Sequence, residues 1–379
     1  MNNLKIIGLT FLMLCTITRE SKAQTNVAAQ RAKSLGLGVN LSYLEAFWTL
    51  RSDTGNFVNI NVVKQKKSVL AAIARQGFKS VRLPVCFSAW LSKDAPYRWT
   101  QPQNLSAVDS MIKWAQLYKL KIIIDNHAIG YRRGLDSAKL INLARVEFMW
   151  RQIATRYKNT NPNNVIFELW NEPENITDDA WYNTARVLIR DVRAIALNHS
   201  IIVGNNHANS LDALLLLKPF DDDNIIYTFH YYRPKLFTEQ ADAHDKSMQS
   251  FGKVGFPYNQ TLAAKRVVST NKYEKWLYGD YLTYTPNAIK QDFVKVKKWA
   301  TNNNVPVFCG EFGVTVHASP GDRCNYYSSI INNLSDLNIP GTAFEWGDMK
   351  GFPLTDGQNN LLPNIKPAVA SYNRKFSAR

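Results

Sequence analysis

Residues 120–127 of this 379-residue chain read Leu-Lys-Ile-Ile-Ile-Asp-Asn-His. A short apolar run that is followed at once by polar side chains is typical of a parallel strand that is buried on both faces and ends at a pocket. Seven further runs of this kind lie at 37–41, 80–85, 164–170, 200–204, 224–229, 305–309 and 341–346. The sequence therefore predicts eight strands, most of them continuously apolar rather than alternating.

Amphipathic stretches separate the predicted strands. In three of them apolar residues recur every three or four positions, as they do along one face of a helix. These residues are Leu140, Leu143, Val146, Trp150, Ile153 and Tyr157, then Leu188, Val192, Ile195 and Ala196, then Phe293, Val296, Trp299 and Ala300. Eight strands that alternate with helices predict a single-domain (β/α)8 TIM barrel. An open doubly wound sheet is the weaker alternative, because no glycine-rich phosphate loop follows the first strand.

The connection between the sixth and seventh strands is much longer than a crossover helix requires. Residues 288–300 supply the helix, which leaves 231–286 as an elaborated loop rich in Phe, Tyr and Trp. Long ordered loops in compact domains are usually functional. We therefore expect this loop to contribute to the site, and a small packed insertion without a direct role is the alternative.

The first 23 residues are expected to be a secretory signal peptide. Lys5 precedes an apolar run over 6–17, and Ser21-Lys22-Ala23 offers the small residues of a cleavage site before Gln24. This predicts a secreted or periplasmic protein whose single domain spans 24–379. An uncleaved anchor is the alternative, although the run is short for spanning a bilayer. No later segment is apolar enough to cross a membrane, so no integral span is expected.

Net charge restricts the classes of binding partner to expect, and the cysteine content bears on disulfides. The net charge of +16 would fall to +14 on cleavage, but the basic residues are scattered and no nucleic-acid motif occurs. No nucleic acid is therefore expected as a partner, whereas attraction to acidic polysaccharide or a cell surface stays open. Cys86, Cys309 and Cys324 form an odd set, which implies no disulfide framework. We expect a monomer.

The predicted strand ends carry an unusual set of side chains. Because the active site of a (β/α)8 barrel lies at the carboxyl ends of its strands, these side chains are expected to converge on one pocket. In strand order they are Asn40 and Glu45; Arg82; Asp125, Asn126 and His127; Asn171 and Glu172; Asn205, Asn206 and His207; His230, Tyr231 and Tyr232; Glu311; and Glu345 and Trp346. Packing alone does not explain so many acids, amides, histidines and aromatics at one end of a barrel.

Two carboxylates stand out in this set. Glu172 and Glu311 follow the fourth and seventh strands, which lie on opposite sides of a barrel mouth. A pair of carboxylates that flanks one bond is the requirement for glycoside hydrolysis, where one donates a proton and the other attacks or activates water. The negative charge of each raises the pKa of the other, which keeps the acid protonated. For a single glutamate at a strand end, a salt bridge would be the simpler interpretation.

These motifs resemble a known family. Ile166-Phe-Glu-Leu-Trp-Asn-Glu-Pro173 and Gly310-Glu-Phe-Gly313 look like the two signatures of glycoside hydrolase family 5, the cellulase family of clan A. The resemblance runs from about Leu37 to Trp346, and all eight family positions have a counterpart in order. The counterparts are Arg82, His127, Asn171, Glu172, His230, Tyr232, Glu311 and Trp346.

The resemblance implies a retaining double displacement in which Glu311 is the nucleophile and Glu172 is first the acid and then the base. It also implies substrate-binding and supporting roles for the other positions. Arg82 would keep Glu311 ionised, Tyr232 would hydrogen-bond near it, His230 would orient Glu172, Asn171 would bind the 2-hydroxyl of the reacting sugar, His127 would contact that sugar and Trp346 would stack beneath it.

The expected function is therefore a secreted endo-β-glycanase that acts on β-1,4-glucan as a polysaccharide or oligosaccharide substrate and needs no cofactor. Other family substrates, namely β-mannan, β-1,3-glucan and xylan, stay open. A non-catalytic carbohydrate-binding barrel is a rival, but both acids are present. A metal-dependent barrel hydrolase is another, with zinc on His127, His207 and His230, but no metal-binding histidine spacing occurs.

Further side chains are ambiguous from the sequence. His207 suits either a sugar contact or loop packing. Trp48, Trp90, Tyr131 and Trp181 are candidate sugar platforms, although an aromatic residue is more often part of the core.

Overall fold

The computed structural model describes residues 26–44, 60–127, 143–243, 245–257, 269–347, 351–356, 358–363 and 365–377. Eight parallel strands close into a barrel in chain order, with β8 paired to β1. They are β1 (Leu37–Asn40), β2 (Ser80–Val85), β3 (Lys121–Asn126), β4 (Val165–Glu168), β5 (Ile201–Val203), β6 (Ile225–Tyr231), β7 (Val307–Phe312) and β8 (Gly341–Ala343). The predicted TIM barrel is confirmed.

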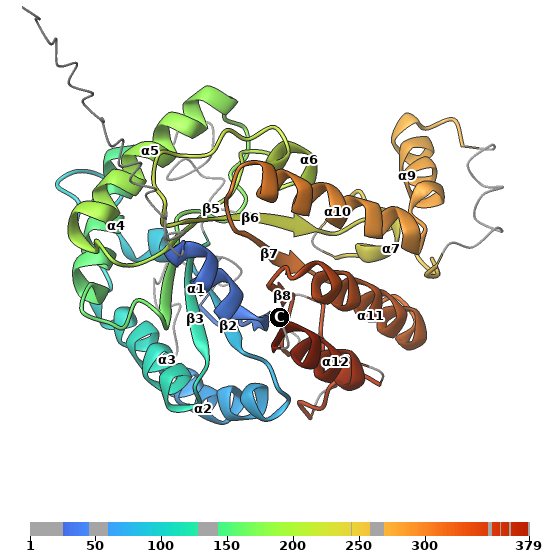
Figure 1. Ribbon diagram of the computed structural model, residues 1–379, viewed down its shortest axis with the longest axis horizontal. Coiled ribbons are helices and arrows are strands. Elements are labelled where there is room, and N and C mark those ends of the chain that lie inside the picture. Colours follow the sequence, from blue (N-terminus) through green and yellow to red (C-terminus); the bar gives the residue numbers. More distant parts are fainter. Residues whose placement is uncertain are drawn as a thin grey trace, which may run out of the picture.

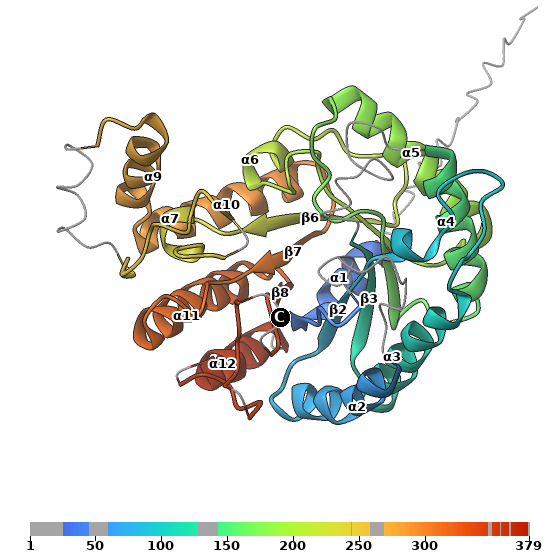
Figure 2. The same ribbon diagram turned by 180° about the vertical axis from the view of Figure 1, so that it is seen from behind.

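Helices surround this barrel (Figures 1 and 2). The main ones are α2 (Ile60–Arg75), α3 (Leu105–Leu117), α4 (Leu143–Tyr157), α5 (Asp178–Ile195), α10 (Pro286–Asn302), α11 (Pro320–Leu337) and α12 (Ile365–Ser377), with the single turn α6 (Leu211–Leu214) after β5 and the short 3-10 helices η2 (Phe87–Trp90) and η3 (Pro102–Asn104) after β2. The predicted apolar stripes lie in α4, α5 and α10, apart from Leu140, which is outside the described residues, and Ala196, which caps α5.

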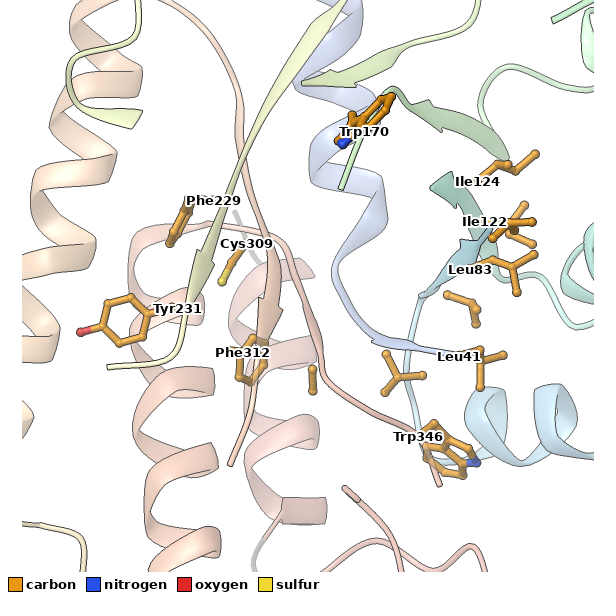
Figure 3. Packing of buried hydrophobic residues seen from close by; sticks show 14 of the residues in the cluster. Leu41, Leu83, Ile122, Ile124, Trp170, Phe229, Tyr231, Cys309, Phe312 and Trp346 are labelled. Carbon is orange, nitrogen blue, oxygen red and sulfur yellow. The ribbon is translucent and has the colours of Figure 1, made fainter. Parts of the chain in front are cut away.

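Side chains alternate between the two faces of the strands, as the pleat requires. Ile122 and Ile124 on β3 face the helices and belong to the large outer cluster, part of which Figure 3 shows. Ile123 points inward instead. It packs at the N-terminal end of the barrel with other inward residues and with α1 (Val27–Leu35), the helix that closes this end. The members of this inner cluster are Ala28, Ala32, Leu35, Ile123, Ile166, Ile202, Ile226 and Phe308.

The same alternation places charged residues inside the barrel. Asp125 lies two residues after Ile123, and Glu168 lies two residues after Ile166, so both point into the interior nearer the carboxyl ends of the strands. Arg82 lies between Val81 and Leu83, both of which face the helices, so it points inward too. The barrel interior is therefore apolar at one end and charged at the other.

The long connection after β6 contains α7 (Lys235–Thr238) and α9 (Lys272–Thr283). In Figures 1 and 2, α9 lies at the periphery of the molecule, beyond α7. The Phe237 ring packs on Phe256 and on Tyr326 of α11, with centroids 5.3 and 5.6 Å apart. Beyond Tyr232, which lies at the start of the predicted loop, this packing fits the alternative interpretation of the connection as a packed insertion.

Two further expectations concern the N-terminus and the cysteines. The predicted signal peptide lies outside the described residues, and no helix of the described chain is long and apolar enough to cross a membrane. Cys86, Cys309 and Cys324 are all buried.

Candidate active site

Glu311 reaches the interior because β7 is irregular. Phe308 points inward and Cys309 outward, so strict alternation would turn Glu311 outward with Cys309. The pairing with β6 shifts by one residue at Gly310, and this bulge returns Glu311 to the inside. Only glycine fits there, because a Cβ at Gly310 would lie 2.6 Å from Thr228 Oγ1 and 3.0 Å from His230 Nε2.

Both carboxylate oxygens of Glu311 accept short hydrogen bonds. Arg82 Nη1 donates to Oε1 at 2.6 Å, and the Tyr232 hydroxyl donates to Oε2 at 2.8 Å. Burial alone would raise the pKa of Glu311, but the charges of His230, Arg82 and His127 and the hydrogen bond from Tyr232 lower it to about 2. Glu311 is thus held ionised and in one orientation, as a nucleophile must be.

Glu172 follows β4 in the left-handed region, with φ of 45°, and is half-buried. Its Oε1 lies 2.6 Å from Nδ1 of His230, and the same Nδ1 lies 3.7 Å from Oε2 of Glu311. One oxygen of each glutamate lies within 4.8 Å of the other. Carboxyl groups of retaining glycosidases are about 5–5.5 Å apart, against about 6.5–9.5 Å in inverting ones.

Arg82 is the centre of the network and is fully buried. Its Nε and Nη2 donate to both oxygens of Glu168, at 2.7 and 2.9 Å. Nη1 also donates to Asn40 Oδ1 at 2.9 Å, and Nη2 donates to Asn171 Oδ1 at 2.7 Å and contacts Asp125 Oδ2 at 3.0 Å. Burial lowers the pKa of Arg82, but Asp125, Glu168 and Glu311 raise it well above its usual range. The guanidinium is therefore a fixed positive charge.

His127 joins the network through Asp125. Its Nδ1 lies 2.7 Å from Asp125 Oδ2, and its Nε2 lies 3.5 Å from Asn171 Nδ2. Burial raises the pKa of Asp125 to about 7, although Arg82 opposes this shift. Burial likewise raises the pKa of Glu168. One arginine thus serves three buried carboxylates, of which Glu311 alone has a lowered pKa.

The structure brings seven of the eight predicted site residues into this one connected network. They are Arg82, His127, Asn171, Glu172, His230, Tyr232 and Glu311. Asn40 and Asp125, two of the strand-end side chains expected to converge, also join the network through Arg82. Glu168 is a member that was not predicted, because it lies inside an apolar run, although its two-residue spacing from Ile166 could have placed it inside the barrel.

Trp346 is the predicted site residue that does not join the others. Its side chain is fully buried and its ring meets the edge of Phe78 at 6.0 Å, within the outer cluster drawn in Figure 3. Stacking beneath a sugar needs an accessible ring face, so the expected role of Trp346 does not fit its position. The aromatic side chains connected to Tyr232 are instead Phe352, 5.9 Å away, and behind it Phe344.

The remaining candidates lie elsewhere. His207 is exposed and pairs with Asp178 at 3.0 Å, apart from the network, so it does not converge with His127 and His230 on a zinc ion. Trp90 and Trp181 are core residues. Glu45, Trp48 and Tyr131 lie outside the described residues.

Among the described residues, Glu172, His230 and Glu311 form the one group of three potential metal ligands that lie close together. These side chains bind one another, Arg82 and Tyr232, so we assign no metal to them.

Comparisons with known proteins agree with the family resemblance of the sequence motifs. A family model described as Cellulase (glycosyl hydrolase family 5) matches residues 38–350. Endoglucanase 3 of Fibrobacter succinogenes is 29% identical over 91% of this chain, which spans only 54% of that protein. Endoglucanase C of Acetivibrio thermocellus is 27% identical over 74% of this chain and 83% of its own length. A solved structure titled endoglucanase superimposes with a TM-score of 0.71 at 26% identity, over 90% of this chain and 99% of the other.

Proposed function

The chain belongs to glycosyl hydrolase family 5, and from this premise we propose that it hydrolyses β-1,4-glucan as a retaining endoglucanase. The names of the relatives support the substrate and the mode of cleavage. The observation that carries the mechanism is the short separation of Glu172 and Glu311, whose nearest ligating oxygens lie within 4.8 Å. This separation is closer to the roughly 5–5.5 Å between the carboxyl groups of retaining enzymes than to the roughly 6.5–9.5 Å of inverting ones.

In the first step Glu311 attacks the anomeric carbon of the bound glucan. The bond from that carbon to the glycosidic oxygen breaks, and Glu172 gives its proton to the departing oxygen. Glu311 is suited to this attack because Arg82 and Tyr232 fix both of its oxygens and help to keep it ionised. The product of this step is a glycosyl ester of Glu311.

In the second step Glu172, now a carboxylate, takes a proton from a water molecule. The oxygen of that water attacks the anomeric carbon, and the ester bond to Glu311 breaks. Glu172 is again protonated and Glu311 again ionised, so two inversions leave the sugar with its original configuration. His230, 2.6 Å from Glu172, orients this carboxyl group in both steps.

Asn171 and His127 are proposed to bind the reacting sugar. Arg82 donates to Oδ1 of Asn171 and so turns its Nδ2 toward His127, next to the two glutamates. Asn171 Nδ2 would then donate to the 2-hydroxyl, a hydrogen bond that strengthens in the transition state of glycoside hydrolysis.

We also propose that the protein acts as a secreted monomer. Residues 1–23 would be the signal peptide and 24–379 the catalytic domain. The apolar run and the small residues before Gln24 support this division.

The test is product formation on carboxymethyl cellulose, barley β-glucan, laminarin, galactomannan and xylan by the wild type and by Glu311→Ala. We expect wild-type cleavage of the β-1,4-glucans, with the β-anomer formed first by NMR, and no turnover by the variant. Azide should restore turnover to Glu311→Ala on an activated aryl glycoside and give the inverted product. An α-anomer from the wild type would overturn the mechanism, and cleavage of mannan or xylan alone would overturn the substrate.

A further inference from the structure

The loop between β5 and α6 brings a buried amide to His230. Asn209 has φ of 53°, in the left-handed region that Asn tolerates better than most residues. Its carbonyl accepts the backbone N–H of His230 at 2.8 Å, and the next residue, Ser210, pairs with His230 as a parallel bridge. The side chain of Asn209 is fully buried. The backbone therefore fixes this amide against the histidine.

The Asn209 amide faces the ring nitrogen that does not face Glu172. Its Nδ2 lies 3.4 Å from Nε2 of His230, whereas Nδ1 of the same ring lies 2.6 Å from Glu172. Asn209 Oδ1 has no hydrogen-bond partner within the described part of the chain, so its contact with His230 is the one polar contact that this amide makes there.

The surrounding backbone makes room for this pair. A Cβ at Gly204 would lie 1.8 Å from Asn209 Oδ1, and a Cβ at Gly310 would lie 3.0 Å from His230 Nε2. Any other residue at Gly204 would displace the amide. The space therefore accommodates the Asn209 side chain only because Gly204 has none.

Hydrogen-bond chemistry then fixes the tautomer. Asn209 turns Nδ2 rather than Oδ1 toward the ring, and an amide nitrogen can only donate, so in this arrangement Nε2 of His230 is the bare, accepting nitrogen. The proton of a neutral imidazole then sits on Nδ1 and points at Glu172. If Nε2 also carried a proton, the ring would be a cation and Glu172 would remain ionised beside it, unable to protonate a leaving group.

The carboxylates around His230 favour that unproductive cation, whereas Arg82, the positive charge among the neighbouring groups, opposes it. These groups come from every neighbouring element and are Glu172 after β4, Glu168 on β4, Glu311 on β7, Asp125 on β3 and Arg82 on β2. Burial lowers the pKa of His230, but Glu311 and Glu172 raise it above its usual value. A donor on Nε2 opposes this effect.

We propose that Asn209 is a positioning residue that holds His230 as the neutral tautomer protonated on Nδ1, so that the catalytic proton resides on Glu172. The inference rests on the proposed role of Glu172 as acid and base. In this proposal the β5–α6 loop controls the protonation state of Glu172 through His230. The loop does so without contacting the substrate.

The test is Asn209→Asp, which keeps the shape and the tolerance of positive φ but presents only acceptors to Nε2. We expect the variant to hold His230 as a cation. Its kcat/KM on cello-oligosaccharides should fall at least about 10-fold, because general acid catalysis contributes roughly 10²–10⁴-fold. Hydrolysis of an aryl glycoside with a good leaving group should fall less than about 3-fold, since that group needs little protonation.

A second readout does not depend on activity. In ¹⁵N-histidine NMR of the whole protein at pH 7, the His230 signals, identified by their loss in His230→Gln, should show a protonated Nδ1 and a bare Nε2. Asn209→Asp should show both nitrogens protonated. A protonated Nε2 in the wild type, or unchanged signals in Asn209→Asp, would overturn the inference whether or not the enzyme cleaves glucan. An absence of glucan cleavage by the wild type would instead contradict the proposed function.

Two further variants distinguish a specific effect on His230 from a general disturbance of the fold. Asn338 also has positive φ, 52°, and an Oδ1 without a partner in the described residues, but it caps α11 far along the chain from the site. Asn338→Asp should leave the NMR signals and both activities unchanged. Asn209→Gly removes the side chain without strain at this φ and should lower cello-oligosaccharide hydrolysis more than aryl glycoside hydrolysis. Equal losses on both substrates would indicate a merely structural role.

Discussion

The two ends of the barrel interior are built by the same strands with opposite chemistry. At the N-terminal end, Ile123 and Ile166 pack with α1 in a fully buried apolar cluster. Two residues further along the same strands, Asp125 and Glu168 contact Arg82. The apolar end stabilises the fold through burial. At the charged end, the free-energy cost of removing the ions from water is offset only by their close pairing. What the charged end provides is a fixed arrangement of charges around Glu311.

The largest expected effect comes from removing the shared partner at the charged end. Arg82→Met should leave three buried carboxylates without their cation and destabilise the fold by about 3–5 kcal/mol. Activity per folded molecule should fall at least about 100-fold, since Glu311, the proposed nucleophile, loses its contact with Arg82. Urea unfolding and kinetics on β-glucan measure the two effects.

The matched change at the apolar end is Ile123→Ala. It should destabilise by a similar amount, about 2–5 kcal/mol, but leave kcat/KM of the folded protein nearly unchanged. If both variants lost activity alike, the division of the interior into a stabilising end and a functional end would be wrong.

Much of this division could be predicted from the sequence. Apolar runs located all eight strands, because parallel strands are buried on both faces. Glu172 and Glu311 were found because polar residues after such runs meet at one end of a barrel. Glu168 lies within a run rather than after it, and was missed for that reason. Its two-residue spacing from Ile166 was the available signal.

Other features could not be read from periodicity. The bulge at Gly310 reverses the alternation that would point Glu311 outward, and a single glycine in a run does not indicate on which side the next residue lies. β8 ends at Ala343 rather than at the predicted 346, so Trp346 lies beyond the strand, in the outer core. Asn209 lies in a loop with positive φ, where no repeat pattern applies.

A smaller effect should come from the pH dependence of stability at Asp125. Because the pKa of this group is raised to about 7 by burial, the folded protein holds a proton that the unfolded chain releases above about pH 4. Asp125 should therefore lower stability as the pH rises from about 4 to 7, by at most about 1.4 kcal/mol per pH unit, with no further change above that range.

Asp125→Asn cannot ionise and should lack this slope. Urea unfolding of both proteins at pH 4.5, 6 and 7.5 tests this, and the stability of the variant relative to the wild type should grow as the pH rises. Parallel curves would mean that Arg82 keeps Asp125 ionised throughout, so that the charged end holds three anions rather than two and a neutral acid.

The smallest effect probes the contact that separates Glu311 from the other carboxylates. Among the three bound to Arg82, Glu311 alone also accepts a hydrogen bond from a tyrosine, Tyr232, at 2.8 Å. Tyr232→Phe removes this bond and keeps the ring against Phe352. The pKa of Glu311 should rise from about 2 by roughly one to two units, since a hydrogen bond to a charged group is worth about 1.5–3 kcal/mol. The acidic limb of kcat/KM should move up by the same amount, while the basic limb stays in place. A shift of the basic limb instead would show that Tyr232 acts on the His230–Glu172 pair, and that Glu311 stays ionised without the hydrogen bond from Tyr232.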